Sequence, residues 1–284
     1  MDWIALAVVA LFLFGASRIL YIKASAQEAI PEDKFLRSLY FAGLATMSPL
    51  ALAEWHRFTI GNIYSGIVLG LLSVLGSLAL YRAVSVSSPS IVNVIIGLNF
   101  IIPLVVGLLV LKEKLTYLQT IGLALALITI ILSTLFDIIQ EKERKSLTLK
   151  GLAYTLITFF TWGLLGVAVK FLYNLDILQS VSQCLCIMYL SGLVTITVLH
   201  RTRENSIIES ISKLGIAAGL LSSVGSYLVT LCYAIGEISI TALITRFSYL
   251  LPAAYSLATS CEKLTYHKIV ILALSIISVV LLSL

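Results

Sequence analysis

Charged residues are scarce in this sequence, and their scarcity excludes a water-soluble globular protein. Asp, Glu, Lys and Arg make up 12% of the 284 residues, whereas soluble domains carry about 25%. Hydrophobic residues make up 60%, and the mean hydropathy is +1.05. So few charges cannot cover a protein surface in water, but a surface that faces lipid needs no such cover. We therefore predict that most of the chain lies in a membrane.

The residue patterns that catalysis and metal binding require are also missing. The 14 carboxylates and three histidines all lie at the ends of apolar runs or between them, so no acid pair and no metal-ligand cluster is expected inside the membrane. The four cysteines form no C-x-x-C pair, which argues against a zinc site or a disulfide framework. No G-x-x-x-x-G-K-[ST] motif occurs, so no nucleotide-binding loop is predicted. We expect no enzyme activity, no cofactor and no metal.

Ten apolar runs account for nearly all of the chain. A membrane-spanning helix needs about 20 mostly apolar residues. The runs lie at 3–22, 35–53, 61–81, 90–111, 117–136, 151–173, 178–199, 214–235, 238–259 and 266–284. The first run has neither a basic segment before it nor a small-residue cleavage site after it, so it is expected to be a retained helix. We predict an all-α integral membrane protein with ten transmembrane helices.

The two halves of the chain repeat one sequence. Residues 66–77, GIVLGLLSVLGS, match residues 215–226, GIAAGLLSSVGS, at eight of twelve positions after a shift of 149 residues. The same shift pairs Pro103 with Pro252 and superposes E-K-L-T-Y at 113–117 on E-K-L-T-Y at 262–266. A bias toward Leu, Ile and Val does not bring a Gly, a Pro and a charged pentapeptide into one register. We infer an internal duplication.

Each unit of this duplication holds five predicted spans. Because five is odd, the second unit must enter the membrane in the opposite orientation to the first, as in the inverted repeats of many secondary transporters. The polar stretch DIIQEKERKSLTLK at 137–150 lies between the units. We predict a first five-helix repeat at 1–139, a polar linker at 140–148 and a second, inverted five-helix repeat at 149–284.

This organisation resembles a known family. Each half has a Pro within its fourth span and an E-K-L-T turn before its fifth, at Glu113–Thr116 and Glu262–Thr265. These features are similar to those of the ten-helix EamA-type branch of the drug/metabolite transporter superfamily, and the similarity covers essentially the whole chain. The resemblance implies that the first, third and fourth helices of each half surround a central cavity. It also implies transport of small organic molecules, but no single substrate.

The basic residues and the family resemblance predict opposite orientations in the membrane. Most of the 19 Lys and Arg residues flank one set of gaps between spans, and only Arg57, Lys112 and Lys114 flank the other set. The positive-inside rule then places both termini outside, whereas the resemblance implies that both are cytoplasmic. With either orientation, the expected location is the plasma membrane.

Arg246 is the charged residue that lies deepest in a predicted span. It is about eight residues from the nearer end of 238–259, where a charge costs about 2.5–3.5 kcal/mol. It could face a cavity and bind an anionic or zwitterionic substrate, because a guanidinium matches carboxylate and phosphate. It could instead bond backbone carbonyls or hydroxyls as a structural group. The 149-residue shift places Gly97 at the corresponding position, which favours the substrate role.

Further candidates for substrate binding lie on several spans. Arg18 and Lys170 could line the cavity, although both are close enough to a span end to reach the lipid headgroups. Polar and aromatic residues form the remaining candidates, which are Asn93, Asn99, Thr245, Tyr249, Trp162 and Tyr227. Each of these residues could equally serve helix packing.

Small residues and prolines predict the scaffold and its hinges. Gly66 and Gly70 form a G-x-x-x-G pair, as do Gly215 and Gly219, and such pairs let two helix backbones approach closely. Pro103 and Pro252 each remove one backbone donor. They could kink helices that move during transport, or lie in ordinary packed helices.

These patterns predict a secondary transporter that moves a small polar organic metabolite, anionic or zwitterionic, by alternating access. A flippase of a lipid-linked phosphate on the same fold and a membrane assembly protein without transport activity are the alternatives. The expected partners are a small-molecule substrate and the lipid bilayer. Nucleic acid is not expected, because the basic residues are scattered rather than gathered on one stripe. The sequence leaves the oligomeric state open, and a monomer is compatible with it.

Overall fold

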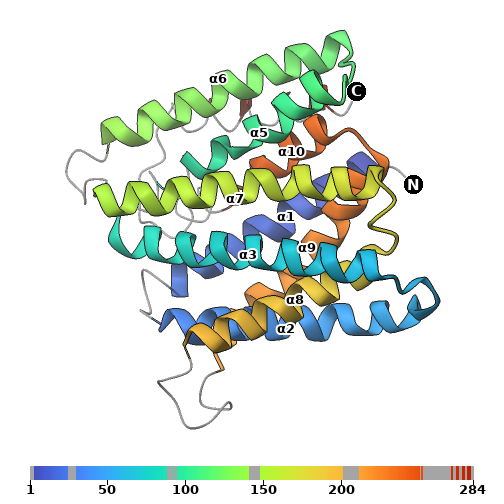
Figure 1. The fold of residues 1–284 in the computed structure, drawn as a ribbon. Helices are drawn as coiled ribbons and strands as arrows, with labels where there is room; N and C mark the ends of the chain where they lie inside the picture. The colour runs from blue at the N-terminus through green and yellow to red at the C-terminus, as the bar shows by residue number, and fades with distance from the viewer. Residues whose placement is uncertain are drawn as a thin grey trace.

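The protein is a bundle of helices in the computed structural model (Figure 1). The structure describes residues 3–24, 30–87, 92, 95–140, 148–200, 211–249 and 251, together with 270, 273, 274, 277, 278 and 280–282. These residues form helices and connecting segments and include no strand. The predicted all-α class is confirmed for this part of the chain.

Eight α-helices of nine or more residues make up most of the described bundle. They are α1 (Trp3–Ile22), α2 (Glu32–Ala53), α3 (Ile60–Val86), α6 (Tyr117–Gln140), α7 (Leu149–Asn174), α8 (Val181–Leu199), α9 (Lys213–Ile235) and α10 (Ile238–Arg246). Among the described residues, α1, α2, α3, α7, α8 and α9 are long and apolar enough to cross a membrane. Six of the ten predicted spans are thus present as single helices, and α6 covers the predicted run at 117–136.

The described parts of the predicted fourth and ninth spans contain turns that are not α-helical. In the fourth, the 3-10 turn η3 (Leu98–Phe100) precedes α5 (Ile101–Val105) and the π-helical turn η4 (Val106–Val110). In the ninth, α10 ends in the 3-10 turn η6 (Phe247–Tyr249). The 149-residue shift superposes η6 on η3.

Proline accounts for the change of helix type in the fourth span. Pro103 has no N–H group, so the carbonyl of Asn99, four residues earlier, lacks its helical donor. That carbonyl lies against α7 at Gly163, where an added Cβ would be 3.0 Å from the Asn99 oxygen. An added Cβ at Gly15 of α1 would likewise lie 2.8 Å from the Ser248 oxygen. Pro252, predicted as the matching hinge, lies outside the described residues.

The helices with G-x-x-x-G pairs pack against the backbone of neighbouring helices. An added Cβ at Gly66 of α3 would lie 2.8 Å from the carbonyl oxygen of Cys184 in α8, and one at Gly70 would lie 2.7 Å from that of Met188. Backbone atoms cannot move aside as a flexible side chain can, so both positions require glycine. Because the higher-numbered glycine meets the higher-numbered partner, α3 and α8 run parallel.

The same packing recurs between α9 and α2. An added Cβ at Gly215 would lie 2.6 Å from the carbonyl oxygen of Phe35, and Gly219 lies in the same way against the carbonyl of Leu39. These four residues are the counterparts of the α3 and α8 residues under the 149-residue shift. The packing of α1 against α9 and of α3 against α7 forms a second corresponding pair.

The helices α2 and α8 also pack directly against each other. Gly43 of α2 lies against the ring of Tyr189 in α8, and Gly192 of α8 lies against the ring of Tyr40 in α2. The higher-numbered α2 residue meets the lower-numbered α8 residue, so these two helices run antiparallel. Figure 1 shows α2 and α8 at one edge of the bundle and α6 at the opposite edge.

Hydrogen bonds tie the loop after α2 and the start of α3 to the start of α8. Ser180 and Ser182 both donate to Oε2 of Glu54, at 2.5 and 2.8 Å, and Asn62 donates to Oε1 of Gln183 at 2.9 Å. Burial acts to raise the pKa of the Glu54 carboxyl, but the two hydroxyl donors and nearby basic side chains outweigh it, so the pKa is lowered. The ionised carboxylate therefore stabilises this end of the fold.

We expect this contribution to disappear in acid. A carboxyl whose pKa is lowered by folding stabilises the protein above its unfolded pKa and loses that effect as the pH falls through the folded pKa. Glu54→Gln should lower the free energy of unfolding by about 1 kcal/mol at neutral pH, since solvent screens this partly exposed group. Thermal unfolding in detergent should show the difference shrinking below about pH 4. A difference that stays constant with pH would contradict the role of the ionised form.

Candidate functional site

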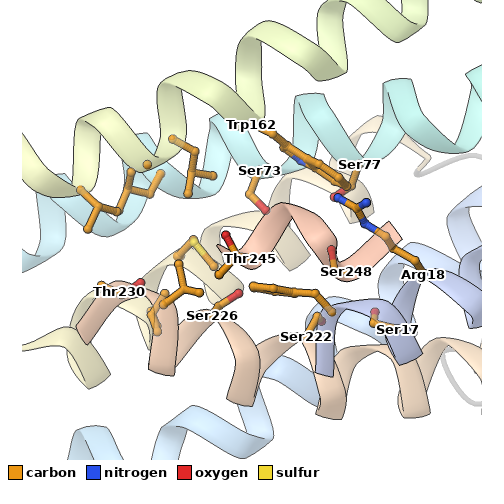
Figure 2. A pocket seen from close by; sticks show the side chains of 18 of the residues that line it. Ser17, Arg18, Ser73, Ser77, Trp162, Ser222, Ser226, Thr230, Thr245 and Ser248 are labelled. Atoms are coloured by element: carbon orange, nitrogen blue, oxygen red, sulfur yellow. The ribbon is translucent and has the colours of Figure 1, made fainter. Parts of the chain in front are cut away.

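A cavity of about 180 Å³ lies inside the bundle. Its walls come from α1, α3, α7, α8, α9, α10 and η6, with one residue of α2. Figure 2 shows hydroxyl groups from several of these helices directed into one space. The labelled lining residues are Ser17, Arg18, Ser73, Ser77, Trp162, Ser222, Ser226, Thr230, Thr245 and Ser248. Helices from both halves of the chain therefore contribute to one site.

The cavity contains positive charge without compensating negative charge. Arg18 and Arg246 both line it, and none of its described lining residues is Asp, Glu or His. Most other polar groups in the wall are serine and threonine hydroxyls, which can donate or accept hydrogen bonds. This combination can accommodate an anionic group far better than a cation.

Arg18 reaches into the cavity from α1. Its Cζ atom lies 6.0 Å from the centre of the Trp162 ring, within the range of a cation–π contact. Figure 2 shows the guanidinium beside Trp162 and Ser77. Its Nη1 atom is buried and has no hydrogen-bond partner among the described residues. Arg18 thus has a donor available inside the bundle, where an unpaired donor is unfavourable.

Arg246 enters the cavity from the last residue of α10. Its Nε atom is buried without a hydrogen-bond partner among the described residues, as is Oγ of Ser248 in η6. The hydroxyl of Thr245 lines the cavity too, but it donates to the carbonyl of Thr241 at 2.9 Å within its own helix. The end of α10 therefore offers one guanidinium and one hydroxyl for binding.

Two groups of hydroxyls correspond under the 149-residue shift. Oη of Tyr40 lies 2.9 Å from Oγ of Ser73 and donates to Oγ of Ser77 at 3.4 Å. Their counterparts are Tyr189, Ser222 and Ser226, and Oη of Tyr189 donates to Oγ of Ser226 at 3.5 Å. The four serines and Tyr189 line the cavity. The repeat thus places similar polar groups on the α3 and α9 sides of the cavity.

Several predicted site residues lie elsewhere. Lys170 donates to the carbonyl of Gly236 at 2.9 Å and does not belong to the cavity wall. Tyr227 and Asn99 are also absent from that wall, although Asn99 is fully buried and both of its amide atoms lack partners among the described residues. Asn93 and the side chain of Tyr249 lie outside the described residues.

The cavity serines were not among the predicted binding residues. Ser73, Ser77, Ser222 and Ser226 were part of the matching segments that revealed the duplication, and that signal could have identified them. A pair of equivalent serines one helical turn apart in each half marks a common helix face. Ser17 and Thr230 carried no comparable sequence signal.

No candidate metal centre is present in the part of the chain that the structure describes, because no three His, Cys, Asp or Glu side chains come together there. The cavity wall instead offers hydroxyl groups for hydrogen bonding and two arginines that carry positive charge.

Comparison with known proteins shows what the first half of the chain is similar to. Residues 1–135 match the model of the EamA-like transporter family. One solved structure, described only as "Crystal structure of protein", matches with a TM-score of 0.75 and covers 98% of this chain and 95% of its own. Its sequence identity of 12% means that the match shows a common fold only. The search of curated proteins gave no match.

Proposed function

We propose that this integral membrane protein is a secondary transporter of a small polar organic metabolite, because residues 1–135 match the model of the EamA-like transporter family. Alternating access of the central cavity is the proposed mechanism. The observation that carries the proposal is the pair of arginines, Arg18 and Arg246, in a cavity whose described walls contain no acidic residue. An anionic substrate, or a zwitterion held by its anionic group, would neutralise this charge.

The unpaired donors support an acceptor-rich ligand. Nη1 of Arg18, Nε of Arg246 and Oγ of Ser248 are buried without partners among the described residues. They come from α1, α10 and η6 and belong to one cavity wall. Carboxylate and phosphate oxygens accept hydrogen bonds from several donors at once. The ring of Trp162 and the surrounding hydroxyls would then contact the rest of the substrate.

The proposed architecture is ten spans in two inverted five-helix repeats, at 1–139 and 149–284, joined by a polar linker at 140–148. Packing supports it, since α3 on α8 corresponds to α9 on α2, and α1 on α9 corresponds to α7 on α3. The antiparallel crossing of α2 and α8, which are equivalent helices, has the direction that an inverted repeat requires. Two such halves around one cavity could expose it to each side in turn.

We further propose that the transporter acts in the plasma membrane, by exchange or facilitated diffusion. Coupling to protons usually uses a carboxylate in the transport path, and the described cavity wall contains none. Exchange needs only a site that binds substrate on both sides.

A ligand panel tests the function directly. We expect carboxylates, phosphates or amino acids to raise the unfolding temperature of the purified protein, and organic cations of similar size to leave it unchanged. The anion that stabilises best should then be taken up by proteoliposomes containing the protein, faster when the same anion is present inside. Stabilisation by cations alone would overturn the substrate class. Anion binding without flux would overturn transport.

A further inference from the structure

The carboxylate of Glu113 joins parts of the chain that are far apart in the sequence. Glu113 lies between η4 and α6, yet its Oε1 accepts from the backbone N–H of Ile238 at 2.8 Å. Its Oε2 accepts from the N–H of Ser239 at 3.1 Å and from the Ser239 hydroxyl at 2.6 Å. These bonds satisfy the first two N–H groups of α10, and the negative charge suits a helix N-terminus.

The residue at the N-cap position of α10 does not cap the helix with its side chain. Glu237 occupies the N-cap position but makes no side-chain capping bond, and its Oε2 is buried without a partner among the described residues. Burial and the neighbouring Glu113 carboxylate raise the pKa of Glu237. The first half of the chain therefore supplies the cap for a helix of the second half.

The backbone before Glu113 is shaped for this contact. The N–H of Glu113 donates to the carbonyl of Gly107 at 3.0 Å, and Lys112 has a φ of 55°, in the left-handed region. An added Cβ at Gly107 would collide with the Ser239 hydroxyl and lie 2.5 Å from Oε2 of Glu113. Glycine at this position lets the two groups meet.

The other end of α10 bears the cavity residues Thr245 and Arg246. The nine-residue helix spans about 12 Å from its capped end to Arg246, so a change at the cap moves the arginine with the helix. Lys170 holds the preceding turn through its bond to the Gly236 carbonyl. Contact between the halves at Glu113 is thus linked mechanically to the cavity.

We propose that Glu113 is a positioning residue that latches α10 to the first half of the chain and must release it when the cavity opens at that end. This inference rests on the proposed transport function, because it assigns the latch to the alternating movement of the halves. The turn at Glu113–Thr116 caps two helices. Glu113 caps α10, while Thr116 accepts from the N–H of Gln119 at 3.2 Å and so caps α6 of its own half.

Side-specific labelling of the substrate-free protein tests the latch. The reporter is Val229→Cys in the cavity wall of α9, in a background in which the native cysteines are replaced by alanine. A membrane-impermeant maleimide is applied to vesicles of each orientation, and the ratio of the two labelling rates is measured. The variants are Glu113→Gln, Ser239→Ala and, as the matched control, Glu237→Gln, which makes the same chemical change in a carboxyl that forms no cap.

We expect Glu113→Gln to raise labelling from the membrane face nearest the N-terminus of α10 several-fold, while Glu237→Gln labels like the parent. Ser239→Ala removes one of the three bonds and should give a smaller shift in the same direction, and it decides the matter if Glu113→Gln does not fold. Equal ratios in the parent, Ser239→Ala and Glu113→Gln would overturn the latch. Because the labelling experiment requires no ligand, its result is independent of the ligand panel. Anion binding with unchanged labelling ratios would contradict the latch alone, and altered ratios without anion binding would contradict the proposed function alone.

Discussion

Replacing Arg246 by Gln is expected to abolish the stabilisation of the folded protein by its anionic ligand. A ligand that binds only the folded state at a hundredfold excess over its Kd stabilises by about 2.7 kcal/mol. Removing the Arg246 guanidinium takes away one of the two positive charges in the cavity, and neither the hydroxyls nor Arg18 can replace its hydrogen bonds to the anion. Thermal unfolding with and without ligand measures the loss, and proteoliposome uptake should fall to the level of empty vesicles.

Arg82→Gln is the matched control for this substitution. Arg82 is not part of the cavity wall, and its Nε donates to both carboxylate oxygens of Glu32 at 3.1 Å. Its loss should lower the unfolding temperature slightly, since a partly exposed ion pair contributes little, but should leave the ligand-induced rise intact. If Arg246→Gln keeps the full ligand-induced rise, Arg246 is a structural residue and the proposed anchor is wrong.

Replacing Gly219 by Leu should destabilise the fold more than any other single change considered. The glycine lies against the Leu39 carbonyl of α2, with the Cβ of Ala42 also close, at 2.8 Å from an added Cβ. Backbone on both helices leaves no room, so α2 and α9 must separate. We expect a loss of about 3 kcal/mol, the upper end of the range for overpacking. The measurement is thermal unfolding in detergent, together with the yield of monodisperse protein.

Gly97→Ala provides the control for that prediction. An added Cβ at Gly97 would have no heavy atom within 4 Å, although this glycine is buried in the described structure. Alanine there should be tolerated or should stabilise slightly, because it restricts the unfolded chain more than glycine does. Equal losses for Gly219→Leu and Gly97→Ala would show that the close approach of α2 and α9 does not limit stability.

The helices that could be predicted are those whose signal is local. The run at 3–22 has the bounds of α1, and the run at 214–235 lies within one residue of α9, because continuous hydrophobicity of spanning length is written in neighbouring residues. The 3-10 turns η3 and η6 were not predicted, although Pro103 signalled a possible kink. A 3-10 turn also depends on close contact with Gly163 or Gly15, which lie on other helices.

In the candidate site, too, the residues with a local sequence signal could be predicted, and those that depend on neighbouring helices could not. Arg246 could be singled out because one charge inside an apolar run is conspicuous. Arg18 resembled a residue that reaches for the headgroups, and only the surrounding helices turn it toward Trp162. Lys170 had a similar sequence setting but bonds the turn before α10. Arg18 and Lys170 occupy similar positions in their apolar runs, but the helices packed around them differ, so only Arg18 lines the cavity.

The sequence by itself determined that this chain is a helical membrane protein whose halves share matching segments, with glycines at helix contacts and an arginine deep in an apolar run. These properties can be read from the hydropathy of neighbouring residues and from the comparison of the two halves. Only the tertiary structure decided which hydroxyls share a cavity, which arginines lie in it, and that Glu113 caps a helix 125 residues away. Almost every face of these helices is apolar, so hydrophobic pattern cannot distinguish lipid from protein, and the packing of the helices makes that distinction.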